Sequence, residues 1–240
     1  MSSLKNKTAF LFFFCFAFVS LLSADEAVGD PDAARFKHEI NRFMAWDKKN
    51  SFPDRAILFL GSSSIRMWPS AEYFPELKVI NRGFGGAHIS DVNYYYKKIV
   101  LKYSPRLIVF YAGDNDIAAG KSISQVLEDF RKFINRVGQD LKGAKILYLP
   151  VKPSPSRWQF WQKMNTFNMR IKKLCGQREN LIYVDTASPM LGNDQRPRKK
   201  LFISDGLHLN KKGYDLWTSI LKSYIFDLLK IRKRGAVLKN

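Results

Sequence analysis

Short apolar runs that stop at a glycine or a polar residue alternate with amphipathic stretches along most of this 240-residue chain. An apolar run of four to eight residues is typical of a strand buried on both faces, as parallel strands are. Five such runs are present, at 56–60, 77–81, 106–111, 145–151 and 180–185. This alternation predicts an α/β three-layer sandwich around a five-stranded parallel, doubly wound sheet with right-handed crossovers.

The stretches around these runs have apolar residues at helical spacing. We expect helices at 33–48, 89–101, 122–141, 157–174 and 211–231. With 46% apolar residues the chain can bury one sizeable core, and no internal repeat divides it. A single domain is therefore expected.

Glycines and polar side chains follow the first three predicted strands. The segment 61–64 is Gly-Ser-Ser-Ser, the segment 82–86 is Arg-Gly-Phe-Gly-Gly, and the segment 112–116 is Ala-Gly-Asp-Asn-Asp. The carboxyl ends of parallel strands are where α/β folds place their ligands. A glycine turn exposes backbone N–H groups, and an asparagine amide can donate to a developing oxyanion. Each segment alone also fits an ordinary turn or helix cap, but their succession at strand ends favours a site.

The segment Asp-Gly-Leu-His at 205–208 supplies an acid and a base just before the last predicted helix. A serine hydroxyl needs an adjacent base to become a nucleophile, and that base needs an orienting partner. Asp205 can hold one ring nitrogen of His208 and leave the other facing a serine. The remaining histidines are His38, expected on the surface, and His88, expected in a solvent-exposed first turn of a helix. His88 is the second choice of base.

These segments resemble the sequence blocks of the SGNH hydrolases, also called GDSL esterases and lipases. The family is named for a Ser, a Gly, an Asn and a His. FLGSSSI, NRGFGGA, GDND and DGLH match four of its blocks, and the resemblance extends from about residue 56 to residue 229. The matching positions imply that Ser63 is the nucleophile and that Gly86 and Asn115 are the oxyanion-hole donors. They also imply that Asp205 and His208 are the acid and the base.

The first block departs from the family pattern at Ser62, where an aspartate is usual. Ser62 and Ser64 therefore stay as alternative nucleophiles to Ser63. The resemblance implies a flavodoxin-like strand order and a serine esterase that needs no cofactor. Its expected substrates are short acyl esters, with glycan deacetylation or lysophospholipid hydrolysis as further candidates. The alternative is a non-catalytic protein that binds envelope glycans or lipids on a degenerate SGNH fold.

The amino terminus has the pattern of a secretory signal peptide. Lys5 and Lys7 precede the apolar run 8–22, and small residues end at Ala24 before an acidic junction. This pattern predicts a signal peptide at 1–24 and one catalytic domain with a basic C-terminal tail at 25–240. The protein is then periplasmic or secreted. An uncleaved N-terminal membrane anchor is the alternative, because the run is rich in Phe.

Without the first 24 residues, Cys175 is the single cysteine, so no internal disulfide can form and we expect a packing role for it. No Cys and His cluster has metal-ligand spacing, and no metal is expected. The net charge of +19, with basic clusters at 196–200 and 232–234, favours an anionic membrane or envelope surface as partner. A basic surface without a partner remains open, whereas export and the lack of a recognition motif argue against nucleic acid. A monomer is expected.

Two further features surround the predicted site. The proline-rich segment 150–156 follows a strand end and is expected to form one wall of the cleft. Apolar residues at helical spacing between 158 and 171 are expected to belong to the core rather than to an acyl pocket.

Overall fold

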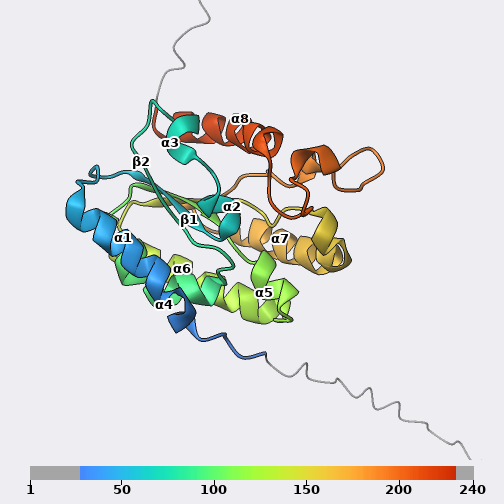
Figure 1. The fold of residues 1–240 in the computed structure, drawn as a ribbon, viewed down its shortest axis with the longest axis horizontal. Helices are drawn as coiled ribbons and strands as arrows, with labels where there is room; N and C mark the ends of the chain where they lie inside the picture. The colour runs from blue at the N-terminus through green and yellow to red at the C-terminus, as the bar shows by residue number, and fades with distance from the viewer. Residues whose placement is uncertain (1–27, 231–240) are drawn as a thin grey trace, which may run out of the picture.

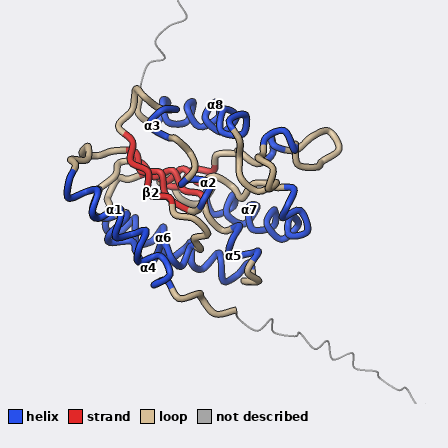
Figure 2. The backbone as a smooth tube through the Cα atoms, viewed as in Figure 1, coloured by secondary structure: helices blue, strands red, loops and turns tan. Residues whose placement is uncertain are grey.

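The computed structural model describes residues 28–230, so the predicted signal segment and the basic cluster at 232–234 lie outside the described residues. Its five strands form one parallel sheet in the order β2-β1-β3-β4-β5 (Figure 1 and Figure 2). This is the flavodoxin-like order, which confirms the predicted fold. The strands are β1 (Ile57–Gly61), β2 (Val79–Gly83), β3 (Leu107–Tyr111), β4 (Lys145–Tyr148) and β5 (Leu181–Tyr183).

Helices cover both faces of the sheet, and alternate residues of each strand enter two separate apolar cores. Leu58 and Leu60 of β1 pack toward one layer of helices, and Ile57 and Phe59 pack toward the other. The first layer contains α1 (Lys37–Lys49), α4 (Ile89–Ile99), α6 (Ile123–Asp140) and α7 (Trp161–Cys175). The second contains α2 (Ser63–Arg66), α3 (Ser70–Tyr73) and α8 (Lys211–Leu228). None of the helices within residues 28–230 has the length and hydropathy to cross a bilayer.

The structure corrects the predicted start of one helix and adds several short helical elements. The helix expected at 157–174 begins as a 3-10 segment and becomes α-helical only at Trp161, because Arg157 has the non-helical angles φ −115° and ψ 23°. The remaining short elements are α5 (Asp114–Ala118), η1 (Ala33–Phe36), η2 (Leu101–Tyr103), η3 (Pro155–Phe160), η4 (Ser188–Met190) and η5 (Lys199–Leu201).

The strand expected at 145–151 ends at Tyr148, because the chain then leaves the sheet toward α7. The backbone N–H of Val151 donates to the Asn168 side chain at 2.9 Å, and the Asn168 amide donates back to the Val151 carbonyl at 2.8 Å. Asn168 is buried together with Met164, Phe167 and Ile171. The apolar residues at 164, 167 and 171, which belong to the helically spaced set between 158 and 171, are therefore in the core, as predicted. Cys175 is half-buried against the same core, which confirms its packing role.

A sharp turn after β1 brings the chain to the carboxyl edge of the sheet. Gly61 has φ +139°, and a Cβ built on it would lie 1.8 Å from the backbone oxygen of Tyr111 in β3. The next residue, Ser62, donates its N–H to that same oxygen at 3.0 Å. The pairing of β1 with β3 therefore leaves no space for a side chain at position 61, and it places the three serines at the sheet edge.

Replacing Gly61 by alanine should strongly destabilise the fold. We expect Gly61→Ala to lower the free energy of unfolding by on the order of 3 kcal/mol, because the methyl group meets rigid backbone at an unfavourable φ. Urea unfolding followed by circular dichroism measures the loss. Gly143→Ala is the matched control, since Gly143 has φ +84° but open space around its Cβ position. Equal losses in the two variants would contradict the steric argument.

Candidate active site

Three side chains from two distant segments form a hydrogen-bonded row at the sheet edge. Ser63, the first residue of α2, has its Oγ 3.0 Å from Nε2 of His208. The other ring nitrogen of His208, Nδ1, lies 2.6 Å from Oδ2 of Asp205. This is the spacing that a nucleophile, a general base and an orienting acid require. The predicted acid, base and serine are thus brought together.

The Asp205 carboxylate is held by its own turn. Its Oδ1 accepts the backbone N–H groups of Leu207 at 2.8 Å and His208 at 2.9 Å. Burial opposes ionisation of the carboxyl group, but hydrogen bonds from the His208 ring and these two amides outweigh it and lower the pKa of Asp205 to about 2. Asp205 is therefore a carboxylate at any pH near neutrality, and it can stabilise an imidazolium.

The three neighbouring serines have different surroundings. The Ser62 hydroxyl is buried and has no hydrogen-bond partner, and the Ser64 hydroxyl accepts a hydrogen bond from Lys152 Nζ at 2.9 Å. Ser63 alone among them contacts the His208 ring. Among the three serines, the geometry therefore favours Ser63 as the nucleophile.

The two residues predicted for the oxyanion hole meet at the turn after β2. Gly86 has φ +77°, and a Cβ on it would meet no atom within 4 Å, so the backbone of this turn is open. Nδ2 of Asn115 donates to the carbonyl of Ala87, the residue after Gly86, at 3.1 Å. The amide end of Asn115 is thus placed beside the glycine turn, where both groups can face one oxyanion.

The prediction of an exposed His88 was wrong. The residue is 6% exposed, and its buried Nδ1 has no hydrogen-bond partner. Burial, followed by the charges of Lys121 and Arg35, lowers the pKa of His88 to about 4. Its Nδ1 lies 3.8 Å from Asp116 and contacts none of the three serines, so the structure does not support His88 as the base. His38 is exposed, as predicted.

Sequence reasoning missed two cations in the segment after β4. Lys152 lies within the proline-rich stretch expected to line the cleft, Arg157 follows it directly, and both side chains reach the site. Lys152 is 2% exposed and contacts Ser64, while an Arg157 nitrogen donates to Oδ1 of Asn115 at 2.8 Å. The only signal in the sequence is their position directly after a strand end. Among residues 28–230, no group of three or more His, Cys, Asp or Glu side chains is arranged to hold a metal ion.

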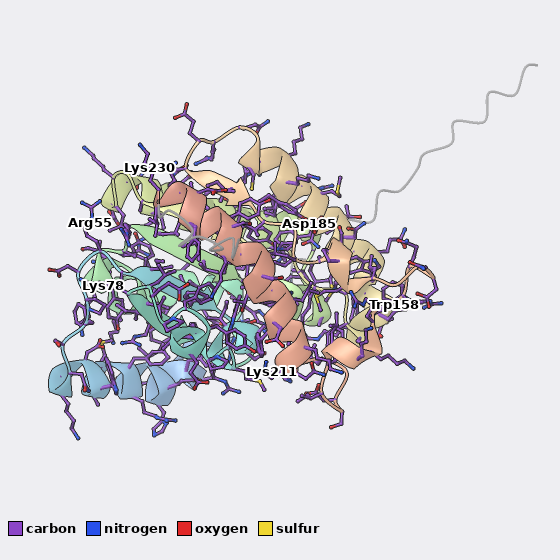
Figure 3. All side chains as sticks on the ribbon, turned by 90° about the horizontal axis from the view of Figure 1, so that it is seen from above. Arg55, Lys78, Trp158, Asp185, Lys211 and Lys230 are labelled. Carbon is purple, nitrogen blue, oxygen red and sulfur yellow. The ribbon has the colours of Figure 1, made fainter. Side chains whose placement is uncertain are left out.

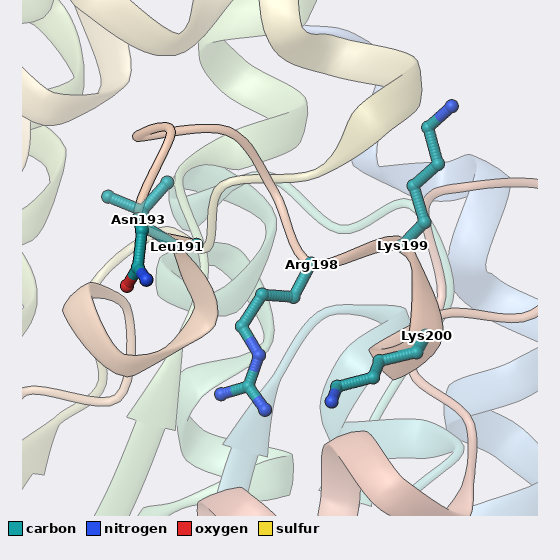
Figure 4. Close-up of a pocket in the computed structure, with 6 residues that line it drawn as sticks. Leu191, Asn193, Arg198, Lys199 and Lys200 are labelled. Carbon is teal, nitrogen blue, oxygen red and sulfur yellow. The ribbon is translucent and has the colours of Figure 1, made fainter.

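Two surface hollows adjoin the segments that carry the row. One of about 500 Å³ is bordered by Met67, at the end of α2, and by Leu209, next to His208. Another of about 480 Å³ is lined by Arg198, Lys199 and Lys200, which precede the Asp205 turn (Figure 4).

Figure 3 places the site end of the molecule relative to the sheet. Trp158, which follows Arg157, lies toward one end. Arg55 and Lys78, which precede β1 and β2, lie toward the other. The site thus occupies the edge formed by the carboxyl ends of the strands.

The sequence profile of the GDSL-like Lipase/Acylhydrolase family matches residues 65–216. The chain belongs to this family. The match includes four of the predicted positions, Gly86, Asn115, Asp205 and His208, and begins two residues after Ser63. Membership in the GDSL-like family makes the chain a serine hydrolase that acts on ester bonds. No curated protein matches the sequence.

Solved structures share the fold of this GDSL-like chain at low sequence identity. A GDSL-like lipase from Bacteroides thetaiotaomicron superposes with a TM-score of 0.69 and 20% identity, covering 79% of this chain and 98% of that one. A variant of an acetyl-xylooligosaccharide esterase from Geobacillus Stearmophilus superposes with a TM-score of 0.60 and 14% identity, covering 73% and 96%. At these identities the likeness shows the fold alone.

The burial of His88 should make the stability of the protein depend on pH. In the unfolded chain a histidine titrates near its ordinary value of about 6.5, whereas the folded pKa is about 4. The unfolded state therefore binds more protons between these values, and stability should fall by on the order of 3 kcal/mol as the pH decreases from 6.5 to 4. Above pH 6.5 this contribution is complete.

In the variant His88→Asn, the loss of folding stability between pH 6.5 and pH 4 that comes from the buried histidine should be absent. Denaturant unfolding at several pH values from 4 to 7 measures the slope, and the exposed His38→Asn serves as the control. A His88→Asn protein whose stability falls with acid as steeply as that of the wild type would contradict the buried neutral ring.

Proposed function

We propose that this chain hydrolyses carboxylic esters through an acyl-enzyme formed on Ser63. The 3.0 Å contact between Ser63 Oγ and His208 Nε2 carries the proposal. Neutral His208 takes the hydroxyl proton as Oγ attacks the ester carbonyl. Asp205 keeps the proton of the ring on Nδ1 and stabilises the imidazolium that forms.

The tetrahedral oxyanion is held by the backbone N–H groups of Ser63 and Gly86 and by the side-chain amide of Asn115. When the intermediate collapses, His208 returns the proton to the leaving alcohol, and the acyl group stays on Ser63. Water then attacks the acyl-enzyme with His208 again as base, which releases the carboxylic acid and restores the serine. A donor of this kind typically contributes about 10²–10³ in turnover.

We propose short acyl esters as the substrate class, with deacetylation of a glycan as the natural reaction and lysophospholipid hydrolysis as the runner-up. The fold shared with an acetyl-xylooligosaccharide esterase supports an acetylated glycan. The sequence also has no long apolar insertion that could serve as a lipase lid.

The proposed setting is outside the cytoplasm, beside an anionic surface. The signal-like segment at 1–24 supports export, and the enzyme is proposed to be a monomer. Arg198, Lys199 and Lys200 gather at the hollow of Figure 4 and would attract acidic envelope polymers or lipid head groups.

Removing the Ser63 hydroxyl should abolish ester hydrolysis without unfolding the protein. We expect Ser63→Ala to lower kcat on p-nitrophenyl acetate by at least about 10³-fold, because no other serine contacts the base. Ser62→Ala and Ser64→Ala are the matched controls. Mass spectrometry after treatment with a serine-reactive phosphonate should locate the label on residue 63.

Activity that survives in Ser63→Ala and vanishes in a neighbouring variant would move the nucleophile to that serine. Folded wild-type protein that neither reacts with the phosphonate nor hydrolyses esters would instead favour the binding-only alternative. The alternative is tested because Ser62 stands where the family usually has an aspartate, and its buried hydroxyl has no hydrogen-bond partner.

A series of p-nitrophenyl esters from acetate to palmitate should distinguish the substrate classes. We expect kcat/KM to be highest for acetate and to fall as the acyl chain lengthens, because no apolar lid segment would cover a long chain. Each ester is assayed below its aggregation concentration with Ser63→Ala as the background. A maximum at eight carbons or more would exclude deacetylation as the main activity and favour lipid substrates.

A further inference from the structure

Residues 152–157, which follow β4, contact three of the four loops that carry the proposed catalytic groups. Lys152 contacts Ser64, next to the nucleophile, and Arg157 contacts Asn115, the side-chain donor of the oxyanion hole. Between them, the backbone N–H of Ser156 donates to the carbonyl of Gly206, next to Asp205, at 3.1 Å. This segment, residues 152–157, thus joins loops that follow β1 and β3 to the loop before α8.

We infer that Arg157 is a positioning residue, which holds the Asn115 amide with its N–H group toward the oxyanion. The inference rests on the proposed function and adds a residue to its machinery. It follows from the contacts of the Asn115 amide and of the Arg157 guanidinium.

An asparagine amide has two ends of similar shape and opposite polarity. One end donates two hydrogen bonds, and the other only accepts them. If the amide turned over, Asn115 would present its oxygen to the developing negative charge and raise the energy of the transition state. The orientation of this one side chain therefore decides whether it assists or opposes the reaction.

Contacts on both ends of the Asn115 amide specify one orientation. Arg157 donates to Oδ1 at 2.8 Å, and a guanidinium has no acceptor that could receive an N–H group instead. On the other side Nδ2 donates to the Ala87 carbonyl at 3.1 Å, which can only accept. One hydrogen of Nδ2 is used by Ala87, and the second remains for the oxyanion.

The Arg157 guanidinium is itself held by a buried carboxylate. A second nitrogen of Arg157 lies 3.1 Å from Oδ2 of Asp114, whose side chain is 5% exposed. Burial favours the neutral acid, but the charges of Lys152 and Arg157 outweigh it and lower the pKa of Asp114. Asp114 also accepts the Tyr111 hydroxyl at 3.2 Å. A charged guanidinium held in this way has few alternative positions.

Lys152 completes the arrangement at the nucleophile end. Its Nζ lies 3.5 Å from the same Asp114 oxygen and donates to the Ser64 hydroxyl at 2.9 Å and to the Tyr111 hydroxyl at 3.0 Å. A continuous row of contacts therefore runs from the residue after the nucleophile to the oxyanion donor.

Direct binding of a substrate anion is the other role open to an arginine here. The contacts argue against it, because Nη2 of Arg157 donates to Asn115 and the buried Nη1, which has no hydrogen bond, is paired in charge with Asp114. If Arg157 bound an anion, its loss would raise KM for acidic substrates. If it positions Asn115, its loss lowers kcat for neutral substrates.

A double-mutant cycle between Arg157 and Asn115 tests the inference. On p-nitrophenyl acetate we expect Asn115→Ala to lower kcat by about 10²–10³-fold, and Arg157→Ala to lower it by about 10–100-fold with little change in KM. The double variant should be no slower than Asn115→Ala alone, because Arg157 acts through that amide. Arg170→Ala, an exposed arginine of α7, is the control for losing a positive charge.

Arg157→Lys separates geometry from charge and serves as the second variant if Arg157→Ala does not fold. A lysine keeps the positive charge beside Asp114 but cannot bridge two acceptors as the guanidinium does. We expect kcat to stay at least about 5-fold below that of the wild type. Thermal unfolding by circular dichroism verifies that each variant is folded.

Three results would overturn the inference. These are additive losses in the double variant, a rise in KM with unchanged kcat in Arg157→Ala, or full recovery of kcat in Arg157→Lys. Phosphonate labelling of Ser63 is measured on the same proteins. Wild-type protein without the label would mean that the proposed function fails, whereas labelled protein with additive losses would mean that only the role of Arg157 fails.

Discussion

The Asp114 carboxylate, buried between the ammonium group of Lys152 and the guanidinium of Arg157, is the interaction on which the arrangement of the site depends. Burying charges costs several kcal/mol for each ion, and mutual attraction repays this only where the remaining donors and acceptors are also paired. Here Lys152 donates to Ser64 and Tyr111, and one nitrogen of Arg157 donates to Asn115, whereas the other, Nη1, has an ion pair with Asp114 but no hydrogen bond. The net gain in stability from such a buried cluster is small. What the cluster provides is one defined position for three loops.

The order of the strands explains how so many groups reach one place. The proposed nucleophile follows β1, the glycine turn follows β2, the asparagine follows β3 and the segment 152–157 follows β4. These four strands are neighbours in the sheet, so their carboxyl ends form a continuous edge. The strand order reverses between β1 and β3, which is where sheets of this order bind their ligands. Gly61 allows the chain to enter this edge at van der Waals contact with β3.

Much of this could be predicted from the sequence, because the signals were local. The apolar runs located the strands to within a few residues, and the Asp205 turn placed an acid and a base three residues apart. Lys152 and Arg157 could not be predicted, since a lysine or arginine in a loop is usually exposed. The ion pairs that hold the buried Lys152 and the half-buried Arg157 depend on Asp114, which lies far away in the sequence and becomes a neighbour only when β3 and β4 pair. The burial of His88 escaped prediction for the same reason, because residues from other segments cover it.

The pairing of Lys121 bears on where the folded domain begins. This lysine is almost fully buried and contacts Asp116 at 3.3 Å and Asp129 at 3.1 Å, and it also pairs with Asp30, ahead of the first helix. The carbonyl of Val28 accepts a hydrogen bond from the Gln125 side chain at 2.9 Å. Residues 28–30 are thus part of the globular unit rather than a leader to it. A recombinant chain that starts at Ala33 would remove one of the three carboxylates around a buried ammonium group, whereas one that starts at Asp25 would keep them all.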